Sequence, residues 1–79
     1  MTRQYKGSYN LSIGAALYFW RTLDGLSQRE IAERAHMKRQ NYYRIENSRV
    51  DPRLPSFTRL AKALNVSPYM LALTMEALS

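Results

Sequence analysis

The sequence predicts an all-α domain of five short helices, and three observations support this prediction. Apolar residues recur three and four positions apart in successive segments, and no segment alternates between apolar and polar residues as a β-strand does. Capping residues, glycine and proline separate these segments. With 79 residues, 46% of them hydrophobic, the chain has the size of one domain. A domain this small is marginally stable alone, so dimerisation is an expected remedy.

The first predicted helix covers about residues 12–23 and follows an N-terminal tail. Residues 1–9 show no periodicity, so we expect a flexible tail there and a folded domain over 10–79. Gly25 is the expected stop of this helix. Its apolar positions, which recur near the helical period, are Ile13, Leu17, Trp20 and either Phe19 or Leu23.

The second and third predicted helices follow each other closely. Ser27 and Glu30 form a capping box, in which the Ser hydroxyl accepts from the third amide of the turn and the Glu carboxylate accepts from the Ser amide. The second helix is expected over about 28–34 and the third over about 39–47, with a break of a few residues at His36. The positions expected to face inward are Ile31, Ala32, Ala35, Tyr42 and Ile45.

The last two helices are expected over about 55–64 and 68–78. An Arg-rich loop bracketed by Pro52 and Pro55 precedes the fourth helix, and Asn65 is a suitable left-handed stop for it. The fifth helix begins with Ser-Pro, an N-cap followed by proline at the first helical position. The positions of the fourth helix spaced for burial are Phe57, Leu60, Ala61 and Leu64. Met and aromatic side chains of the first, fourth and fifth helices are expected in the core, with no cofactor site implied.

The net charge predicts a polyanionic partner. Twelve Lys and Arg residues against six Asp and Glu give a formal charge of +6, and the pI is near 10.1. Nine of the twelve basic residues are Arg, whose planar side chain suits phosphate and guanine. Nucleic acid is therefore the first expectation, and an anionic membrane surface is the second. Five basic residues lie within the sixteen positions from Lys38 to Arg53.

Composition also excludes several classes of protein. With no Cys and one His, a disulfide framework, an iron–sulfur cluster and a structural zinc site are not expected, and we expect no metal or cofactor. The longest apolar run, over 13–20, is far shorter than the roughly 20 residues that span a bilayer. No secretory signal is evident, so a cytoplasmic location is expected. Nothing orients a catalytic triad around His36, so an enzyme is not expected.

Two short helices joined by a tight turn on a small basic chain form the layout of a helix-turn-helix. Three stretches sharpen this interpretation: Gly25-Leu26-Ser27-Gln28-Arg29-Glu30-Ile31-Ala32, Arg44-Ile45-Glu46-Asn47 and Leu60-Ala61-Lys62-Ala63-Leu64. With Ile13-Gly14, Leu17 and Trp20-Arg21 before them and Val66-Ser67 after them, they resemble the Cro/lambda-repressor-like family, also called the XRE family. The resemblance runs without a gap from Ile13 to Ser67. It implies a five-helix lambda-repressor-like domain that binds double-stranded DNA.

The resemblance also implies roles for individual residues. The base-reading positions of the recognition helix would be Arg39, Gln40 and Arg44, with Asn41 and Tyr43 beside them. The DNA-backbone positions would be Gln28, Lys38, Asn47, Arg49 and Arg53. Their chemistry suits these roles, because Arg can bind guanine O6 and N7, and Gln can bind adenine N6 and N7. A solvated helix face is the alternative for the base-reading set.

The sequence departs from the family pattern at three positions. His36 occupies a turn position usually held by Gly, and His enters the left-handed region more readily than most residues. Ser48 stands where Gly usually follows the recognition helix. Lys38 replaces the usual Ser or Thr N-cap, at a cost of about 1 kcal/mol. Placement of Lys38 for a phosphate and simple sequence drift both remain open.

Several polar and aromatic residues have structural alternatives. The resemblance implies that Arg21 and Glu46 form an internal ion pair rather than DNA contacts. Tyr42 is expected in the core with its hydroxyl at the edge, whereas Tyr43 either faces DNA or is merely exposed. The basic residues of the tail, Arg3 and Lys6, are either a DNA-contacting arm or part of a solubilising tail.

The fifth helix is apolar on more than one face, which predicts a second copy as partner. One face, with Leu71, Met75 and Leu78, can pack against the first and fourth helices. The residues left for a dimer interface are Met70, Leu73 and Ala77. A two-fold dimer would present two recognition helices about one DNA turn, roughly 34 Å, apart.

These features together predict a homodimeric, sequence-specific transcriptional regulator of the Cro, repressor or restriction-modification controller type that binds an inverted-repeat operator. The alternative is a protein-interaction module, such as an antitoxin, whose partner is a toxin or RNA polymerase. The Arg residues of the third helix argue against this alternative, because a helix that does not contact DNA has no need for them. A non-specific nucleic-acid coater would need more exposed stacking aromatics than are expected here.

Overall fold

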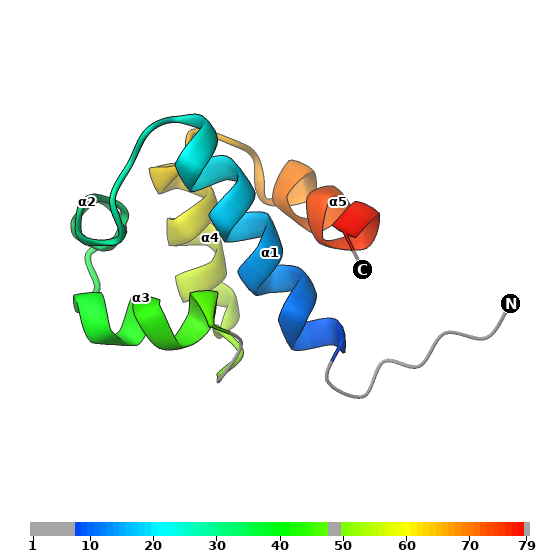
Figure 1. Ribbon diagram of the computed structural model, residues 1–79, viewed down its shortest axis with the longest axis horizontal. Coiled ribbons are helices and arrows are strands. Elements are labelled where there is room, and N and C mark those ends of the chain that lie inside the picture. Colours follow the sequence, from blue (N-terminus) through cyan, green and yellow to red (C-terminus); the bar gives the residue numbers. More distant parts are fainter. Residues whose placement is uncertain (1–7, 48–49, 79) are drawn as a thin grey trace, which may run out of the picture.

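The structure is a computed structural model that describes residues 8–47 and 50–78, with side chains from Ile13 onward. Within these residues it contains five α-helices and no strand (Figure 1). The helices are α1 (Ser8–Leu23), α2 (Gln28–Arg34), α3 (Arg39–Glu46), α4 (Leu54–Ala63) and α5 (Pro68–Leu78). The predicted all-α class and the five-helix architecture are confirmed.

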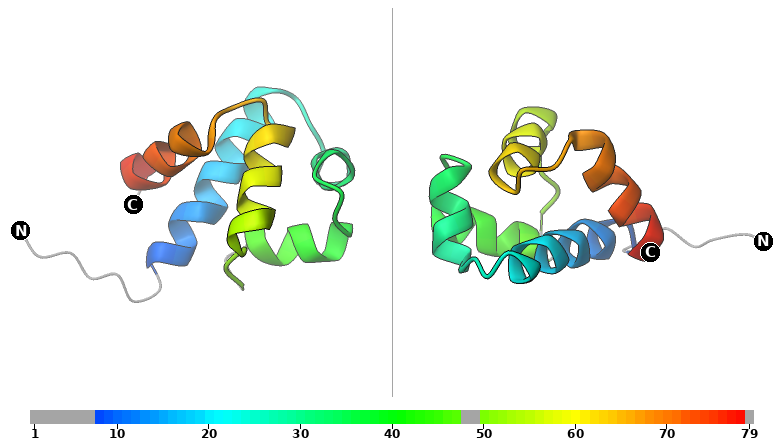
Figure 2. Two further views of the ribbon diagram at one scale, coloured as in Figure 1. Left: turned by 180° about the vertical axis from the view of Figure 1, so that it is seen from behind. Right: turned by 90° about the horizontal axis from the view of Figure 1, so that it is seen from above.

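Helix α1 is the central element of the fold. It packs against α5 on one side and α3 on the other, while α2 contacts α3 and α4, and α4 also contacts α5. Figures 1 and 2 show α2 and α3 gathered at the end of the molecule opposite α5. The helix-turn-helix and the last helix are thus held apart by α1 and α4.

The core lies between the five helices and matches the periodicity of the sequence. Its largest fully buried side chains are Ile13, Leu17, Ile31, Tyr42, Leu60, Leu64 and Leu71. Trp20, Met37, Phe57, Val66 and Met75 pack against them with partial exposure. The inward positions predicted for α2, α3 and α4 are confirmed. Burying one such aliphatic side chain stabilises the fold by about 1.5–3 kcal/mol.

The N-terminal helix begins earlier than the sequence indicated. α1 starts at Ser8, not near residue 12, so residues 8 and 9 of the expected tail are helical. No Gly or Pro occurs over 8–12, and the helix therefore continues beyond its periodic apolar residues. The rest of the expected tail, residues 1–7, lies outside the described residues.

The expectation that aromatic side chains of α1 and α5 enter the core is wrong for several of them. Tyr18, Phe19 and Tyr69 are 56%, 44% and 72% exposed. Leu78, expected to pack inward, is 45% exposed, and Leu23 is 64% exposed. Both helices carry apolar residues on more than one face, and their neighbours cover only one of these faces.

Three helices end at residues in the left-handed region. Gly25 follows α1 with φ 70°, His36 follows α2 with φ 58°, and Asn65 follows α4 with φ 61°. The expected stops and the left-handed histidine are confirmed. Such single residues turn the chain sharply, so α2 and α3 meet across a short connection.

Candidate nucleic-acid interface

The second helix starts at a complete capping box. Ser27 Oγ accepts a 3.0 Å hydrogen bond from the Glu30 amide, and the Ser27 amide donates a 2.8 Å bond to Glu30 Oε1. The bond from the Ser27 amide lowers the pKa of the Glu30 carboxyl. The box predicted from the sequence is confirmed, and it fixes where α2 begins.

The turn between α2 and α3 is held by a contact that sequence reasoning missed. Arg59, on α4, donates from Nε to the carbonyl of Ala35, the C-cap of α2, at 2.9 Å. The next residue, His36, is the left-handed one. Arg59 therefore joins α4 to the turn that sets the direction of α3. No local pattern could indicate a bond between residues 24 positions apart.

The third helix is anchored at its buried side by a polar cluster around Glu46. The carboxylate accepts bonds from Arg21 Nε at 2.8 Å and Arg21 Nη2 at 2.9 Å. It also accepts from the Tyr42 hydroxyl at 2.6 Å and from Gln28 Nε2 at 3.2 Å. Arg21 Nη1 donates to the Leu26 carbonyl at 2.9 Å. The cluster thereby connects α1, α2 and α3.

This environment shifts the acidities of the cluster. Burial raises the pKa of Glu46, but hydrogen bonds from Arg21, Tyr42 and Gln28 outweigh burial and lower it overall. Burial and the bond to Glu46 raise the pKa of the Tyr42 phenol. The bond to Glu46 raises the pKa of Arg21. At neutral pH the cluster therefore contains a carboxylate, a guanidinium and a neutral phenol.

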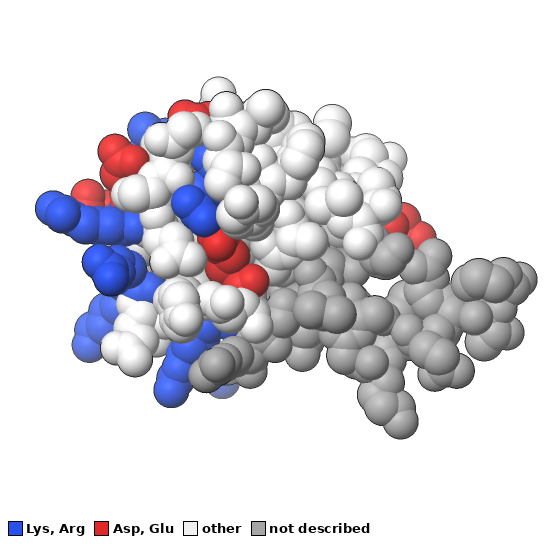
Figure 3. Space-filling model, viewed as in Figure 1, with Lys and Arg blue, Asp and Glu red and all other residues white. Residues whose placement is uncertain are grey.

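The exposed face of α3 carries the side chains expected to read bases. The exposed side chains form two adjacent pairs that lie four positions apart, Arg39 with Gln40 and Tyr43 with Arg44. Tyr42 and Ile45 are buried on the opposite side of the helix. At about 100° per residue, Asn41 lies at the edge of the exposed face rather than at its centre. The view in Figure 3 shows basic side chains concentrated over the end of the molecule that holds α2 and α3.

Three of the residues expected to contact the DNA backbone occupy helix-cap positions. Lys38 and Arg53 occupy the N-cap positions of α3 and α4, both with extended backbone and no side-chain cap bond. Both side chains are exposed. Asn47, the C-cap of α3, donates from Nδ2 to the Tyr43 carbonyl at 2.8 Å. The position of Arg53 as an N-cap was not foreseen, because the fourth helix was expected to begin one residue later than Leu54.

The other expected backbone contacts differ in accessibility. Gln28, at the first position of α2, is half-buried and uses Nε2 to hold Glu46. Arg49 lies outside the described residues, as does Ser48. The structure thus assembles the remaining predicted residues around α3 and the starts of α2 and α4.

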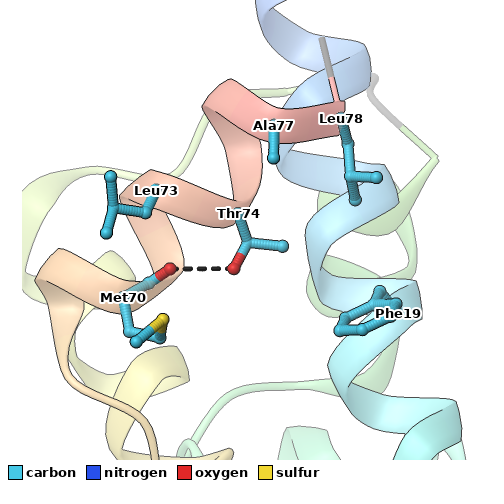
Figure 4. A pocket seen from close by; sticks show the side chains of 6 residues that line it. All are labelled: Phe19, Met70, Leu73, Thr74, Ala77 and Leu78. Carbon is cyan, nitrogen blue, oxygen red and sulfur yellow. Dashed lines mark hydrogen bonds between the residues drawn. The ribbon is translucent and has the colours of Figure 1, made fainter.

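A second, apolar surface lies between α1 and α5. A groove of about 310 Å³ is lined by Phe19 from α1 and by Met70, Leu73, Thr74, Ala77 and Leu78 from α5 (Figure 4). Met70, Leu73 and Leu78 are 43–45% exposed. Phe19 and Leu78 thus join the three residues predicted for a dimer interface.

In the part of the chain that the structure describes, no group of three or more His, Asp or Glu side chains is placed to bind a metal ion. None of the helices in that part of the chain is long and apolar enough to cross a bilayer.

Three solved proteins with similar structures are described as a controller protein, a gene regulator and a hypothetical transcription factor. The restriction-modification controller protein C.AhdI from Aeromonas hydrophila is 29% identical with a TM-score of 0.76, over 78% of this chain and 94% of that one. The clp gene regulator ClgR from C. glutamicum is 22% identical with a TM-score of 0.81, over 87% and 90%. The hypothetical transcription factor NHTF from Neisseria is 26% identical with a TM-score of 0.75, over 78% and 71%.

The comparison with protein families assigns most of the chain to one family. None of the curated proteins matches the sequence significantly. A family model described as helix-turn-helix matches residues 17–71, from the middle of α1 into α5. These residues include the capping box, the left-handed turn and the recognition helix. The chain belongs to the XRE-like, lambda-repressor-like helix-turn-helix family of DNA-binding transcriptional regulators.

Proposed function

We propose that this chain is a sequence-specific transcriptional regulator that binds an inverted-repeat operator as a homodimer. α3 enters the major groove, where Arg39, Gln40 and Arg44 read base edges with Tyr43 and Asn41 beside them. Gln28, Lys38, Asn47, Arg49 and Arg53 hold the DNA backbone. The role is that of a Cro-type repressor or a restriction-modification controller.

The observation that carries this proposal is the two-sided character of α3. Its buried side is held by Tyr42, Ile45 and the Glu46 cluster, so the helix cannot rotate without breaking several bonds. Its other side exposes Arg39, Gln40 and Arg44. A rigid helix with exposed fork-shaped and amide donors matches the geometry needed to recognise guanine and adenine.

The cationic N-caps support contacts to phosphate. α2 and α5 both begin with a Ser whose hydroxyl accepts a backbone amide bond. α3 and α4 instead begin with Lys38 and Arg53, which make no such bond. The backbone amides at the starts of these two helices and the cationic side chains of Lys38 and Arg53 both favour a negatively charged partner. A DNA phosphate is such a partner.

The apolar groove supports a homodimer. Met70, Leu73 and Leu78 are exposed beside Phe19 and form, with Thr74, a largely apolar surface at the end of the molecule opposite α2 and α3 (Figure 1). A two-fold dimer buries the same patch on both copies and leaves both recognition helices free. The likeness to C.AhdI, a restriction-modification controller, supports the same class of role.

Selection from random duplexes tests this function. The wild type should enrich one sequence with two-fold symmetry. Arg39→Ala should lose preference at one position per half-site, by about 1–3 kcal/mol of discrimination. Arg29→Ala is the charge-matched control, because Arg29 lies on α2 and pairs with Glu33 at 3.6 Å. It should keep the base preference of the wild type.

Three outcomes would contradict all or part of the proposal. A wild type that enriches no sequence is not a sequence-specific regulator. An unchanged preference in Arg39→Ala removes Arg39 from the readers. Stoichiometric capture of a toxin or polymerase subunit without salt-sensitive duplex binding would favour the interaction module instead.

A further inference from the structure

Two adjacent residues of α1 form hydrogen bonds to α3 and α5, which lie at opposite ends of the molecule. Arg21 binds Glu46 of α3 through two hydrogen bonds of 2.8 and 2.9 Å. Its neighbour Trp20 donates from Nε1 to Thr74 Oγ1 of α5 at 2.9 Å, between residues 54 positions apart. One turn of α1 therefore sets the position of the recognition helix and that of the last helix.

The bond between Trp20 and Thr74 is geometrically restricted on both sides. Thr74 Oγ1 accepts from Trp20 and also donates to the Met70 carbonyl at 2.8 Å, so its hydroxyl is used in both directions. The Trp20 ring meets the Phe19 ring edge-on, with centroids 5.2 Å apart and an interplanar angle of 82°. Rotation of either side chain would break one of these contacts.

Thr74 also lies in the wall of the apolar groove. Figure 4 shows it between Met70 and Ala77 on α5, with Phe19 facing it from α1. It is the polar member of an otherwise apolar lining. The bond that orients α5 on α1 is therefore located at the surface expected to receive a second copy.

The orientation of α5 controls the separation of recognition helices in any dimer formed through it. Because α3 lies at the end of the molecule opposite α5, a small rotation of α5 on α1 moves α3 by a larger distance (Figure 1). A displacement of about 3.4 Å equals the rise of one base pair. Small changes at the contact of α1 with α5 thus correspond to whole steps along DNA.

We propose that the hydrogen bond between Trp20 and Thr74 sets the half-site spacing that this regulator accepts. The inference rests on the proposed homodimer. Trp20 and Thr74 are positioning residues: they contact no base, and they act through the angle between α5 and α1. Loss of the bond lets α5 adopt a range of angles, so the dimer accepts several spacings with similar affinity.

The test is a series of duplexes in which the same two half-sites are separated by spacers that differ by one base pair. The variants are Thr74→Val, which removes only the hydroxyl, Thr74→Ser, which keeps it, and Trp20→Phe, which removes the indole donor from the other side. Wild type and Thr74→Ser should prefer one spacing. In Thr74→Val and Trp20→Phe that preference should fall about fivefold, the effect of one hydrogen bond.

Single half-site duplexes and sedimentation complete the experiment. Affinity for a single half-site should stay within about twofold of wild type, because α3 is unchanged. A sharp wild-type spacing profile that both variants keep overturns this inference alone. A Thr74→Val chain that becomes monomeric overturns it too, since Thr74 would then be a direct dimer contact. A wild type without any spacing preference contradicts the dimeric function itself.

Discussion

The Tyr42 hydroxyl donates a 2.6 Å hydrogen bond to Glu46 Oε1, one turn further along α3. The same carboxylate receives Arg21 from α1 and Gln28 from α2. Within the described residues, every buried side-chain nitrogen or oxygen has a hydrogen-bond partner. The recognition helix is thus attached to the rest of the domain by a satisfied polar cluster as well as by apolar packing.

Removing the hydroxyl of Tyr42 should weaken the fold without changing its shape. In Tyr42→Phe the buried ring remains, but Glu46 loses one of its donors. A hydrogen bond to a charged group contributes about 1.5–3 kcal/mol, so the free energy of unfolding should fall by that amount. Urea denaturation measures the change. Tyr43→Phe is the control, because Tyr43 is 46% exposed, and an equal loss in both variants would contradict the role of the Tyr42 bond.

Acid should destabilise the domain through Glu46. Its pKa in the folded chain lies below the ordinary value of 4.5, so the unfolded chain binds a proton more readily. The stabilisation is therefore present above pH 4.5 and is lost as pH falls through the lower, folded-state pKa. Urea midpoints measured at successive pH values test this, with Glu46→Gln as the comparison. A wild-type curve that parallels Glu46→Gln over this range would refute the prediction.

Lys38→Ser should stabilise the domain while weakening its binding to DNA. A Ser N-cap can accept a backbone amide bond at the start of α3, which Lys38 does not, and the expected gain is about 1 kcal/mol. Loss of one phosphate contact should reduce the slope of log affinity against log salt by about one. Thermal denaturation and salt titrations of duplex binding measure the two effects.

The matched control for that variant is Lys62→Ser. Lys62 is exposed in the last turn of α4, at the end away from Arg53. Its replacement removes the same charge without adding an N-cap, so we expect neither the gain in stability nor the change in slope. A Lys38→Ser chain with the wild-type slope would show that Lys38 makes no phosphate contact.

Leu73→Glu should convert the proposed dimer into a monomer. Leu73 is 44% exposed and lines the apolar groove, so an interface there would have to bury the new carboxylate unpaired. Sedimentation at a concentration where the wild type is dimeric measures the result. Ala72→Glu is the control, because Ala72 is exposed on α5 outside the groove lining. Dimers in both variants would move the interface elsewhere.

The sequence alone determined the features that depend on neighbouring residues. The capping box at Ser27 follows from side chains within a few positions. Comparison with the family pattern identified the left-handed residue His36 and the start of α3 at Lys38 without a side-chain cap. Helical periodicity likewise identified the buried positions of α2, α3 and α4. Family resemblance supplied the pairing of Arg21 with Glu46, which lies beyond any local rule.

Only the tertiary structure decided which surfaces stay open and which distant groups meet. Periodicity could not show that Phe19 and Leu78 line a groove, because both helices are apolar on several faces. The bonds from Trp20 to Thr74 and from Arg59 to Ala35 join residues 54 and 24 positions apart. Such contacts depend on the angles at which helices cross, and those angles result from packing of the whole core rather than from any local segment.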